Sequence, residues 1–127
     1  MLERAGEKLD FERPIALSLL AVLHFLPDEE DPYGIVRTLV KVLPAGSFLL
    51  LSHGTTDQHP EWKGKIEAAY KEGAIPLRLR SRSEVEPFFE GLELLAPGLV
   101  YATEWYREGP APAPGRSGFH VGVARVP

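Results

Sequence analysis

Residues 14–26, Pro14-Ile-Ala-Leu-Ser-Leu-Leu-Ala-Val-Leu-His-Phe-Leu26, form the apolar run that decides the fold. The run lacks alternation of apolar and polar residues, as a strand buried on both faces would. Periodicity alone does not separate such a strand from a buried helix, so the neighbouring residues must decide. A turn at Pro27 to Pro32 favours a strand. A second apolar run, Ser47-Phe-Leu-Leu-Leu-Ser52, has the usual length of a buried strand.

A helix of about 12 residues is expected between the two runs. Asp31 can cap its first turn, and Pro32 suits the first helical position. One apolar stripe follows, formed by Ile35, Val36, Leu39, Val40 and Leu43. The breaker pair in Pro44-Ala-Gly46 ends the helix. The order strand, helix, strand predicts a parallel pair of strands with a right-handed crossover.

Two further helices are predicted in the second half of the chain. The first runs from about Glu61 to Glu72 with Trp62 on its buried face, and the second lies near Ser81 to Glu90. The capping box of the second helix is formed either by Ser81 with Glu84 or by Ser83 with Glu86. Pro87 fits more easily with Ser83 as the cap, because Pro87 then lies at the edge of the first turn.

Two strands are predicted to close the fold. Leu92 to Tyr106 is typical of a strand bent at Pro97-Gly98, and Phe119, Val121 and Val123 alternate in a final strand. Glu108 to Gly118 holds three Pro and three Gly and is expected to be a mobile loop. If this loop is a hairpin, the final strand is antiparallel to its predecessor.

Composition narrows the class of protein. The chain has 127 residues and 44% hydrophobic residues, which fits one domain, residues 1–127. The absence of Cys excludes disulfides, a thiolate metal site and a cysteine nucleophile. A net charge of -4 argues against a general nucleic-acid binder. The longest apolar run is too short for a membrane span and follows an acidic segment, so a cytoplasmic protein without membrane partners is expected.

Candidate site residues lie at the carboxyl ends of the two predicted parallel strands, His24 to Asp31 and Ser52 to Asp57, because ligands gather at that rim of an open α/β sheet. His24 is a candidate general base. The alternative is a structural histidine whose ring nitrogens are satisfied by backbone groups. The candidate substrate contacts are Asp28, His53, Thr55 and Thr56. Helix capping and turn formation explain Asp28 and the two threonines equally well.

Other candidate features are weaker. His53 and His59 lie six residues apart without a metal-ligand spacing, so no metal site is predicted. Arg78, Arg80 and Arg82 alternate and could meet a phosphate or carboxylate, but such alternation is more typical of a solvated face. A dinucleotide or S-adenosylmethionine site usually has a Gly-rich turn after its first strand, and this sequence lacks one.

The stretches Leu9 to Pro32, Leu43 to His53, Leu79 to Val100 and Val121 to Arg125 together resemble the S-adenosyl methyltransferase family once catalogued only as a domain of unknown function. The resemblance covers nearly all of this chain but only the second half of the family's domain. It implies an α/β fold, the C-terminal half of a Rossmann-like methyltransferase, with parallel strands, an antiparallel end hairpin and helices packed on the sheet.

The resemblance also implies roles for the first strands. Ile15 to Phe25 would be the fourth strand of the methyltransferase sheet and Phe48 to Ser52 the fifth. The cofactor-facing residues would be Ala21, Val22, Leu23 and His24. Leu23-His-Phe-Leu-Pro-Asp28 is similar to the Leu-His-Asp-Trp-Ser-Asp stretch of small-molecule O-methyltransferases, whose His acts as the base.

The function that the resemblance implies is methyl transfer from S-adenosylmethionine to an unidentified small molecule. Because the Gly-rich turn would lie in the family's first half, this chain alone is expected to bind the cofactor poorly. The alternative is a truncated, non-catalytic domain that self-associates or binds a partner. Ile15 to Phe25 would then be a sheet edge with unpaired backbone groups, so we expect a homodimer through this edge or a separate N-terminal half that covers it.

Overall fold

The computed structural model describes residues 2–105, 108 and 117–127. In chain order its main elements are α1 (Leu2–Gly6), β1 (Ala16–Leu20), α2 (Pro32–Lys41), β2 (Phe48–Gly54), α3 (Lys63–Glu72), α4 (Arg82–Val85), β3 (Glu93–Leu94), β4 (Val100–Tyr101) and β5 (Phe119–Arg125). None of the helices in the described ranges is long and apolar enough to cross a membrane. The predicted loop from Glu108 to Gly118 lies mostly outside the described residues.

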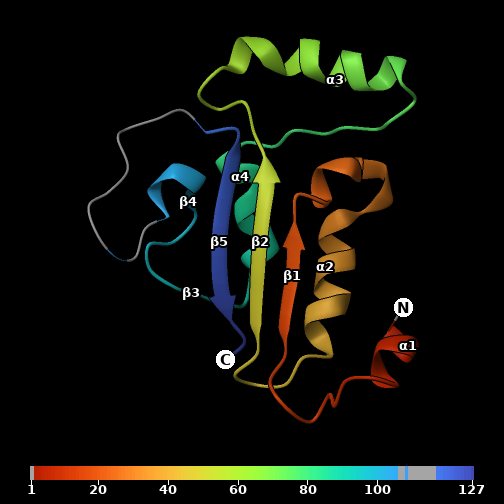
Figure 1. Cartoon of the computed structure of the whole chain (residues 1–127), viewed down its shortest axis with the longest axis vertical. Coiled ribbons are helices and arrows are strands. Elements are labelled where there is room, and N and C mark those ends of the chain that lie inside the picture. The colour runs from red at the N-terminus through yellow and green to blue at the C-terminus, as the bar shows by residue number, and fades with distance from the viewer. Residues whose placement is uncertain (1, 106–107, 109–116) are drawn as a thin grey trace.

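The sheet has the order β1-β2-β5-β3, and β4 also pairs with β5 (Figure 1). β1 and β2 are parallel, with Leu17 opposite Leu49 and Leu19 opposite Leu51. β5 is antiparallel to β2, β3 and β4. The parallel pair and the antiparallel end are therefore confirmed, and β1 stands at an edge of the sheet. The fold is therefore α/β.

The prediction of a strand from Ile15 to Phe25 is wrong at its C-terminal end, because β1 stops at Leu20. Ala21 takes a left-handed conformation with φ 56°, and Leu23–Phe25 form a turn of 3₁₀ helix. This turn is apolar because Leu23 packs in the core, not because it continues the sheet. β2 runs two residues further than predicted, to Gly54.

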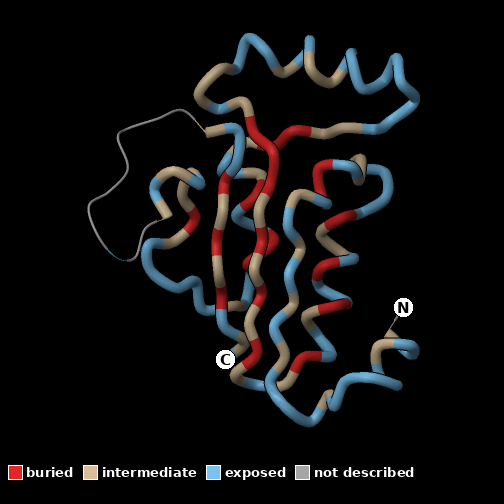
Figure 2. The backbone as a smooth tube through the Cα atoms, in the orientation of Figure 1, coloured by how far each residue is buried: buried red, intermediate tan, exposed pale blue. Residues whose placement is uncertain are grey.

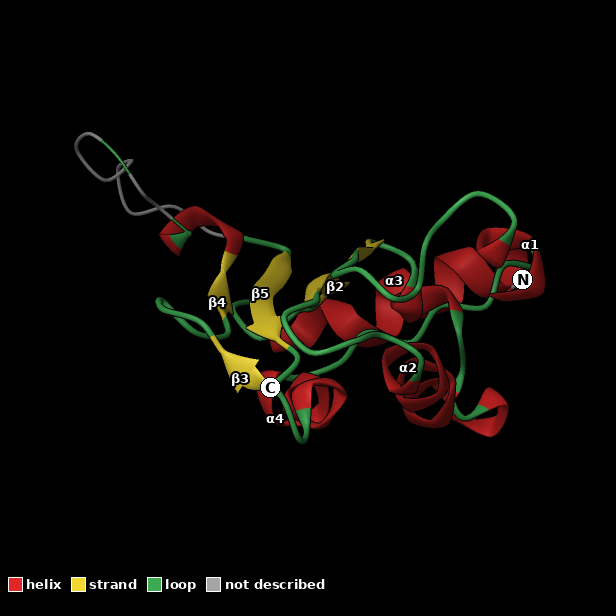
Figure 3. Ribbon diagram, turned by 90° about the horizontal axis from the view of Figure 1, so that it is seen from below, coloured by secondary structure: helices red, strands yellow, loops and turns green. Residues whose placement is uncertain are grey.

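The core lies on the face of the sheet covered by α2 and α4, which occupy the same side in Figure 3. Leu49, Leu51 and Ala124 of the strands are buried there against Val36 of α2 and Val85 of α4. β2 is the most buried strand (Figure 2). The apolar stripe of α2 is confirmed in part, and so is its cap, since the Asp31 carboxylate accepts a hydrogen bond from the Gly34 amide.

The prediction that α3 buries a face with Trp62 is wrong. α3 has no buried residue, and Trp62 is 47% exposed and stacks on the His59 ring, with centroids 3.9 Å apart. The physical reason is position: α3 lies beyond the end of β2, where no core is available to its apolar residues (Figure 1). α3 is fixed instead by Glu67, whose carboxylate accepts a hydrogen bond from the Leu79 amide at 3.1 Å.

The elements after α3 follow the predictions more closely. α4 begins with the capping box of Ser81 and Glu84, so the alternative with Ser83 is wrong. Pro87 is accommodated because the α-helix gives way to a 3₁₀ helix at Glu86–Phe89. The predicted bent strand is present in part, as β3 and β4 on either side of Pro97-Gly98, where Gly98 has φ 92°. The prediction is wrong after Tyr101, because Ala102–Glu104 form a 3₁₀ turn.

Candidate functional site

Two histidines meet at the rim formed by the ends of β1 and β2. His24 lies in the 3₁₀ turn after β1, and His53 is the second-last residue of β2. Their ring centroids are 5.7 Å apart, and His24 is 7% exposed while His53 is fully buried. The parallel pairing of β1 and β2 thus brings these two predicted residues together.

The His24 ring is held by the backbone of the neighbouring strand. Its Nδ1 accepts a hydrogen bond from the Gly54 amide at 3.2 Å, so the neutral ring carries its proton on Nε2. Nε2 has no hydrogen-bond partner within the described part of the chain. Burial and, to a lesser extent, the nearby Arg80 guanidinium lower the pKa of His24 below its usual value, which favours the neutral ring.

His53 adopts the opposite tautomer. Its Nδ1 donates a hydrogen bond to the Gly54 carbonyl at 2.8 Å, and its Nε2 accepts one from the Arg80 guanidinium at 3.0 Å. Burial lowers the pKa of His53 to about 4, although the hydrogen bond to Gly54 acts in the other direction. At neutral pH His53 is therefore an uncharged acceptor for Arg80, and its proposed contact with substrate stays a prediction.

Arg80 is the central residue of this network, which the sequence did not indicate. Its side chain is buried, and its guanidinium donates to the carbonyls of Leu23 at 3.2 Å and Leu26 at 2.9 Å. It also donates to the Asp28 carboxylate at 2.8 Å. The prediction of a solvated face is wrong for Arg80, because the segment that carries it runs between the turn after β1 and the end of β2. The Arg80 amide donates to the Gly54 carbonyl at 3.3 Å.

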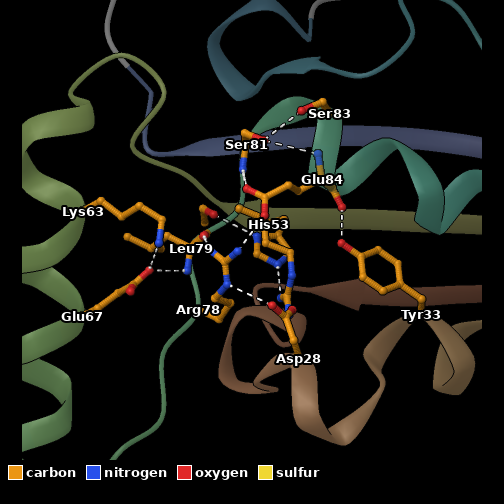
Figure 4. Close-up of polar contacts among 12 residues, drawn as sticks. Asp28, Tyr33, His53, Lys63, Glu67, Arg78, Leu79, Ser81, Ser83 and Glu84 are labelled. Carbon is orange, nitrogen blue, oxygen red and sulfur yellow. Dashed lines mark hydrogen bonds and ion pairs between the residues drawn. The ribbon is translucent and has the colours of Figure 1, made fainter.

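The Asp28 carboxylate forms ion pairs with two arginines, Arg78 and Arg80. One carboxylate oxygen accepts from Arg80, and the other accepts from Arg78 Nε at 3.3 Å. Arg78 also donates to Glu84 at 2.6 Å, so Asp28, Arg78 and Glu84 link the turn to α4 (Figure 4). The hydrogen bond from Arg80 is the main cause that lowers the pKa of Asp28. A substrate role for Asp28 stays a prediction.

The predicted cofactor-facing run from Ala21 to His24 divides into different environments. The Ala21 amide donates to Ser52 Oγ at 2.9 Å, and Val22 is 46% exposed. Leu23 is 2% exposed and belongs to the core. That these four residues face the cofactor stays a prediction.

Thr55 and Thr56 build the turn after β2. Thr55 is buried, and its Oγ1 accepts from the Asp57 amide at 3.1 Å. The Thr56 carbonyl accepts from the His59 amide at 2.7 Å. The Thr55 side chain thus forms the turn, and no hydrogen bond joins either threonine to His24. The substrate contacts of Thr55 and Thr56 stay predictions.

His120 and the Asp57 carboxylate form a second polar contact beside this turn, and the sequence analysis did not predict it. His120 of β5 is opposite His53, and its Nε2 is 2.9 Å from the Asp57 carboxylate. Asp57 also accepts from the Arg82 amide at 2.9 Å, which joins the turn to the start of α4. Within the described ranges, no three His, Asp or Glu residues gather as a metal site would require.

Comparison with known families gives one match over the whole chain. A family model described as S-adenosyl methyltransferase matches residues 1–127. No match was found among curated proteins.

Solved structures give the same picture. A DUF574-family protein from Streptomyces avermitilis is 40% identical with a TM-score of 0.89, and the match covers 96% of this chain and 48% of that one. A candidate methyltransferase from Thermobifida fusca is 25% identical with a TM-score of 0.83, covering 97% and 47%. The N-methyltransferase NodS from Bradyrhizobium japonicum, solved with S-adenosyl-L-homocysteine, shares the fold at 15% identity and a TM-score of 0.52, covering 88% and 45%. This chain spans about half the length of these structures.

Proposed function

Because this chain belongs to the S-adenosyl methyltransferase family, we propose that it forms the C-terminal half of an enzyme that transfers a methyl group from S-adenosylmethionine to a small molecule. The match over residues 1–127 is the observation that carries this proposal. The histidine rim at the ends of β1 and β2 supports it, because ligands of open α/β sheets bind at that edge.

The described residues fit one wall of a cofactor site. His24 has an unpartnered Nε2, and Val22 beside it is exposed, so both can face a ligand at the rim. The chain lacks the Gly-rich turn that approaches such a cofactor closely, so the remaining wall must come from elsewhere.

When bound, S-adenosylmethionine supplies a methyl group on sulfonium, which an acceptor lone pair takes as the carbon–sulfur bond breaks and its electron pair stays on sulfur. The residues of this chain have the task of holding the acceptor in line and excluding water. A hydroxyl or amine acceptor must also lose a proton. The resemblance assigns that proton to His24, but no observation tests this role, and the His24 Nδ1 is already engaged with the Gly54 amide.

We propose further that an N-terminal half covers the open face and edge of this sheet. Leu20 at the end of β1 is 57% exposed, and a hollow on the face opposite the core is lined by Leu20, Leu50, Trp105 and Val121. Monomeric proteins seldom leave such apolar surface uncovered. The solved relatives are about twice as long as this chain, so they contain a segment of the right size to cover it.

Calorimetry with complementation tests both proposals. The chain alone should give little or no heat with S-adenosylmethionine. Binding should appear after the part of the Streptomyces avermitilis relative that this chain does not cover is co-expressed with it. Leu20→Asp should abolish the association, whereas Leu9→Asp, at a site of 49% exposure outside the sheet, should not. Complementation without cofactor binding would refute the enzyme proposal, and a homodimer in light scattering that excludes the added half would refute the partner proposal.

A further inference from the structure

His24 is a nearly buried side chain with one unpartnered polar atom. Among the described residues, two side-chain nitrogens are both fully buried and without a hydrogen-bond partner, namely Arg80 Nε and His120 Nδ1. His24 Nε2 also has no partner but is not one of these buried atoms, so it retains access to solvent. Its other ring nitrogen is committed to Gly54, whose amide is a donor. Because Nδ1 must then be the acceptor, the atom left at the rim is an N–H group.

We propose that His24 serves this site as a hydrogen-bond donor through Nε2–H, and that Arg80 is the positioning residue that holds it there. The ligand atom that fits this donor is an acceptor, such as a carbonyl oxygen or a ring nitrogen. This inference rests on the proposed function for the origin of its ligand.

The neighbours of His24 indicate the shape of that ligand. The Phe25 ring meets the His24 ring edge-on with centroids 4.4 Å apart, and the Phe119 ring lies 6.2 Å away. Phe25 is 38% exposed and Phe119 is 39% exposed, so both keep free surface beside the donor. Aromatic surface around one polar atom suits a planar group that carries an acceptor. Adenine of the cofactor and an aromatic methyl acceptor both have this chemistry.

A base role is disfavoured by the same geometry. To take a proton, His24 would have to become an imidazolium whose Nδ1–H faces the Gly54 amide, which is also a donor. Arg80 and His53 are the charged and titratable groups next to the ring, and neither supplies a negative charge to stabilise an imidazolium. Burial, then Arg80, lowers the pKa of His24, in agreement with a neutral donor.

Arg80 positions His24 through both ends of its turn. The guanidinium binds the carbonyls of Leu23 and Leu26, which flank His24 on either side. The same segment fixes the main chain, since the Arg78 amide donates to the His24 carbonyl at 2.7 Å. A lysine at position 80 would keep the charge but could not span these carbonyls, because its single ammonium lacks the planar fork.

Nitrogen-detected histidine NMR on the 127-residue chain tests the donor role directly. The His24 signals, assigned with His24→Gln, should show the Nε2–H tautomer at pH 7 and titrate below pH 6.5, the usual pKa. The Nδ1–H tautomer, or titration at or above that pH, would overturn the proposal. This readout needs no cofactor, so it stands apart from calorimetry with S-adenosylmethionine.

Matched variants test the positioning role. Arg80→Lys should shift or broaden the His24 signals, whereas Arg78→Lys, in the same segment but with a partly exposed side chain, should leave them in place. Unchanged His24 signals in a folded Arg80→Lys chain would refute the role of Arg80. If Arg80→Lys does not fold, Arg80→Gln takes its place, and unchanged His24 signals in that folded variant would refute the role of Arg80.

Two probes on the complemented protein distinguish the ligand sources. A shift of the His24 Nε2 signal with S-adenosylhomocysteine assigns the donor to the cofactor. A shift only when benzamide is added to that complex assigns it to the methyl acceptor. No shift with either probe would overturn the ligand-binding role.

Discussion

Substituting Gly54 by Ala tests whether the end of β2 sets the position of His24. A Cβ at Gly54 would lie 2.9 Å from Leu79 Cδ2 and 3.1 Å from His24 Nδ1, whereas ordinary contacts begin at 3.4 Å. Leu79 must therefore retreat by about 0.5 Å and the His24 ring by about 0.3 Å. The second movement would lengthen the 3.2 Å bond between the Gly54 amide and Nδ1 beyond the ordinary range.

We expect Gly54→Ala to lower the free energy of unfolding by about 1–3 kcal/mol, as overpacking of a filled interior does. It should also move the His24 signals in NMR spectra. Urea denaturation followed by circular dichroism measures the first effect, and histidine NMR at pH 7 measures the second.

Two other glycines provide controls. A Cβ at Gly122 would lie 2.8 Å from Phe89 Cζ in the core, so Gly122→Ala should lose comparable stability without moving His24. Nothing lies within 4 Å of the Cβ position at Gly64 in α3, so Gly64→Ala should be neutral or stabilising by up to about 1 kcal/mol. Unchanged His24 signals in Gly54→Ala, or equal shifts in Gly122→Ala, would refute the reasoning.

Two further predictions concern charge. Folding lowers the pKa of His53 from 6.5 to about 4, so between these pH values the unfolded chain binds more protons than the folded chain. The free energy of unfolding should therefore be highest above pH 6.5 and fall by up to about 3 kcal/mol as the pH drops toward 4. Urea denaturation at several pH values checks this, since His53→Gln should flatten the dependence and His59→Gln should keep it. Asp28→Asn removes the carboxylate from buried Arg80 and should cost roughly 1–3 kcal/mol, whereas Glu29→Gln should cost almost nothing; equal losses would contradict the assigned ion pair.

Local signals predicted the backbone of this fold well. The parallel pair follows from two apolar runs with a helix between them, and the Asp31 cap is fixed by residues within one helical turn. Such features depend on neighbours in the sequence, so one sequence is sufficient to find them.

Features that depend on distant parts of the chain were not predictable in the same way. Leu23 is apolar, so the sequence does not distinguish it from a residue of a buried strand. In the structure it lies in a 3₁₀ turn and packs in the core. Trp62 has helical spacing with other apolar residues, but α3 lies where no core can receive it. Arg80 has two arginines at alternate positions beside it, and only the carbonyls of a segment more than 50 residues away distinguish it from them.

One residue links the two histidines of the candidate site. The Gly54 amide donates to His24 Nδ1, and the Gly54 carbonyl accepts from His53 Nδ1. Its backbone therefore imposes opposite tautomers on the two rings: His24 keeps a proton on Nε2 for the rim, and His53 keeps a lone pair on Nε2 for Arg80. If His53 were protonated, its Nε2–H would face an N–H group of Arg80, and two donors cannot bond to each other. Arg80 in turn holds the turn that carries His24. His53→Gln should therefore move the His24 signals in NMR spectra at pH 7, whereas His59→Gln, outside this chain of contacts, should leave them in place.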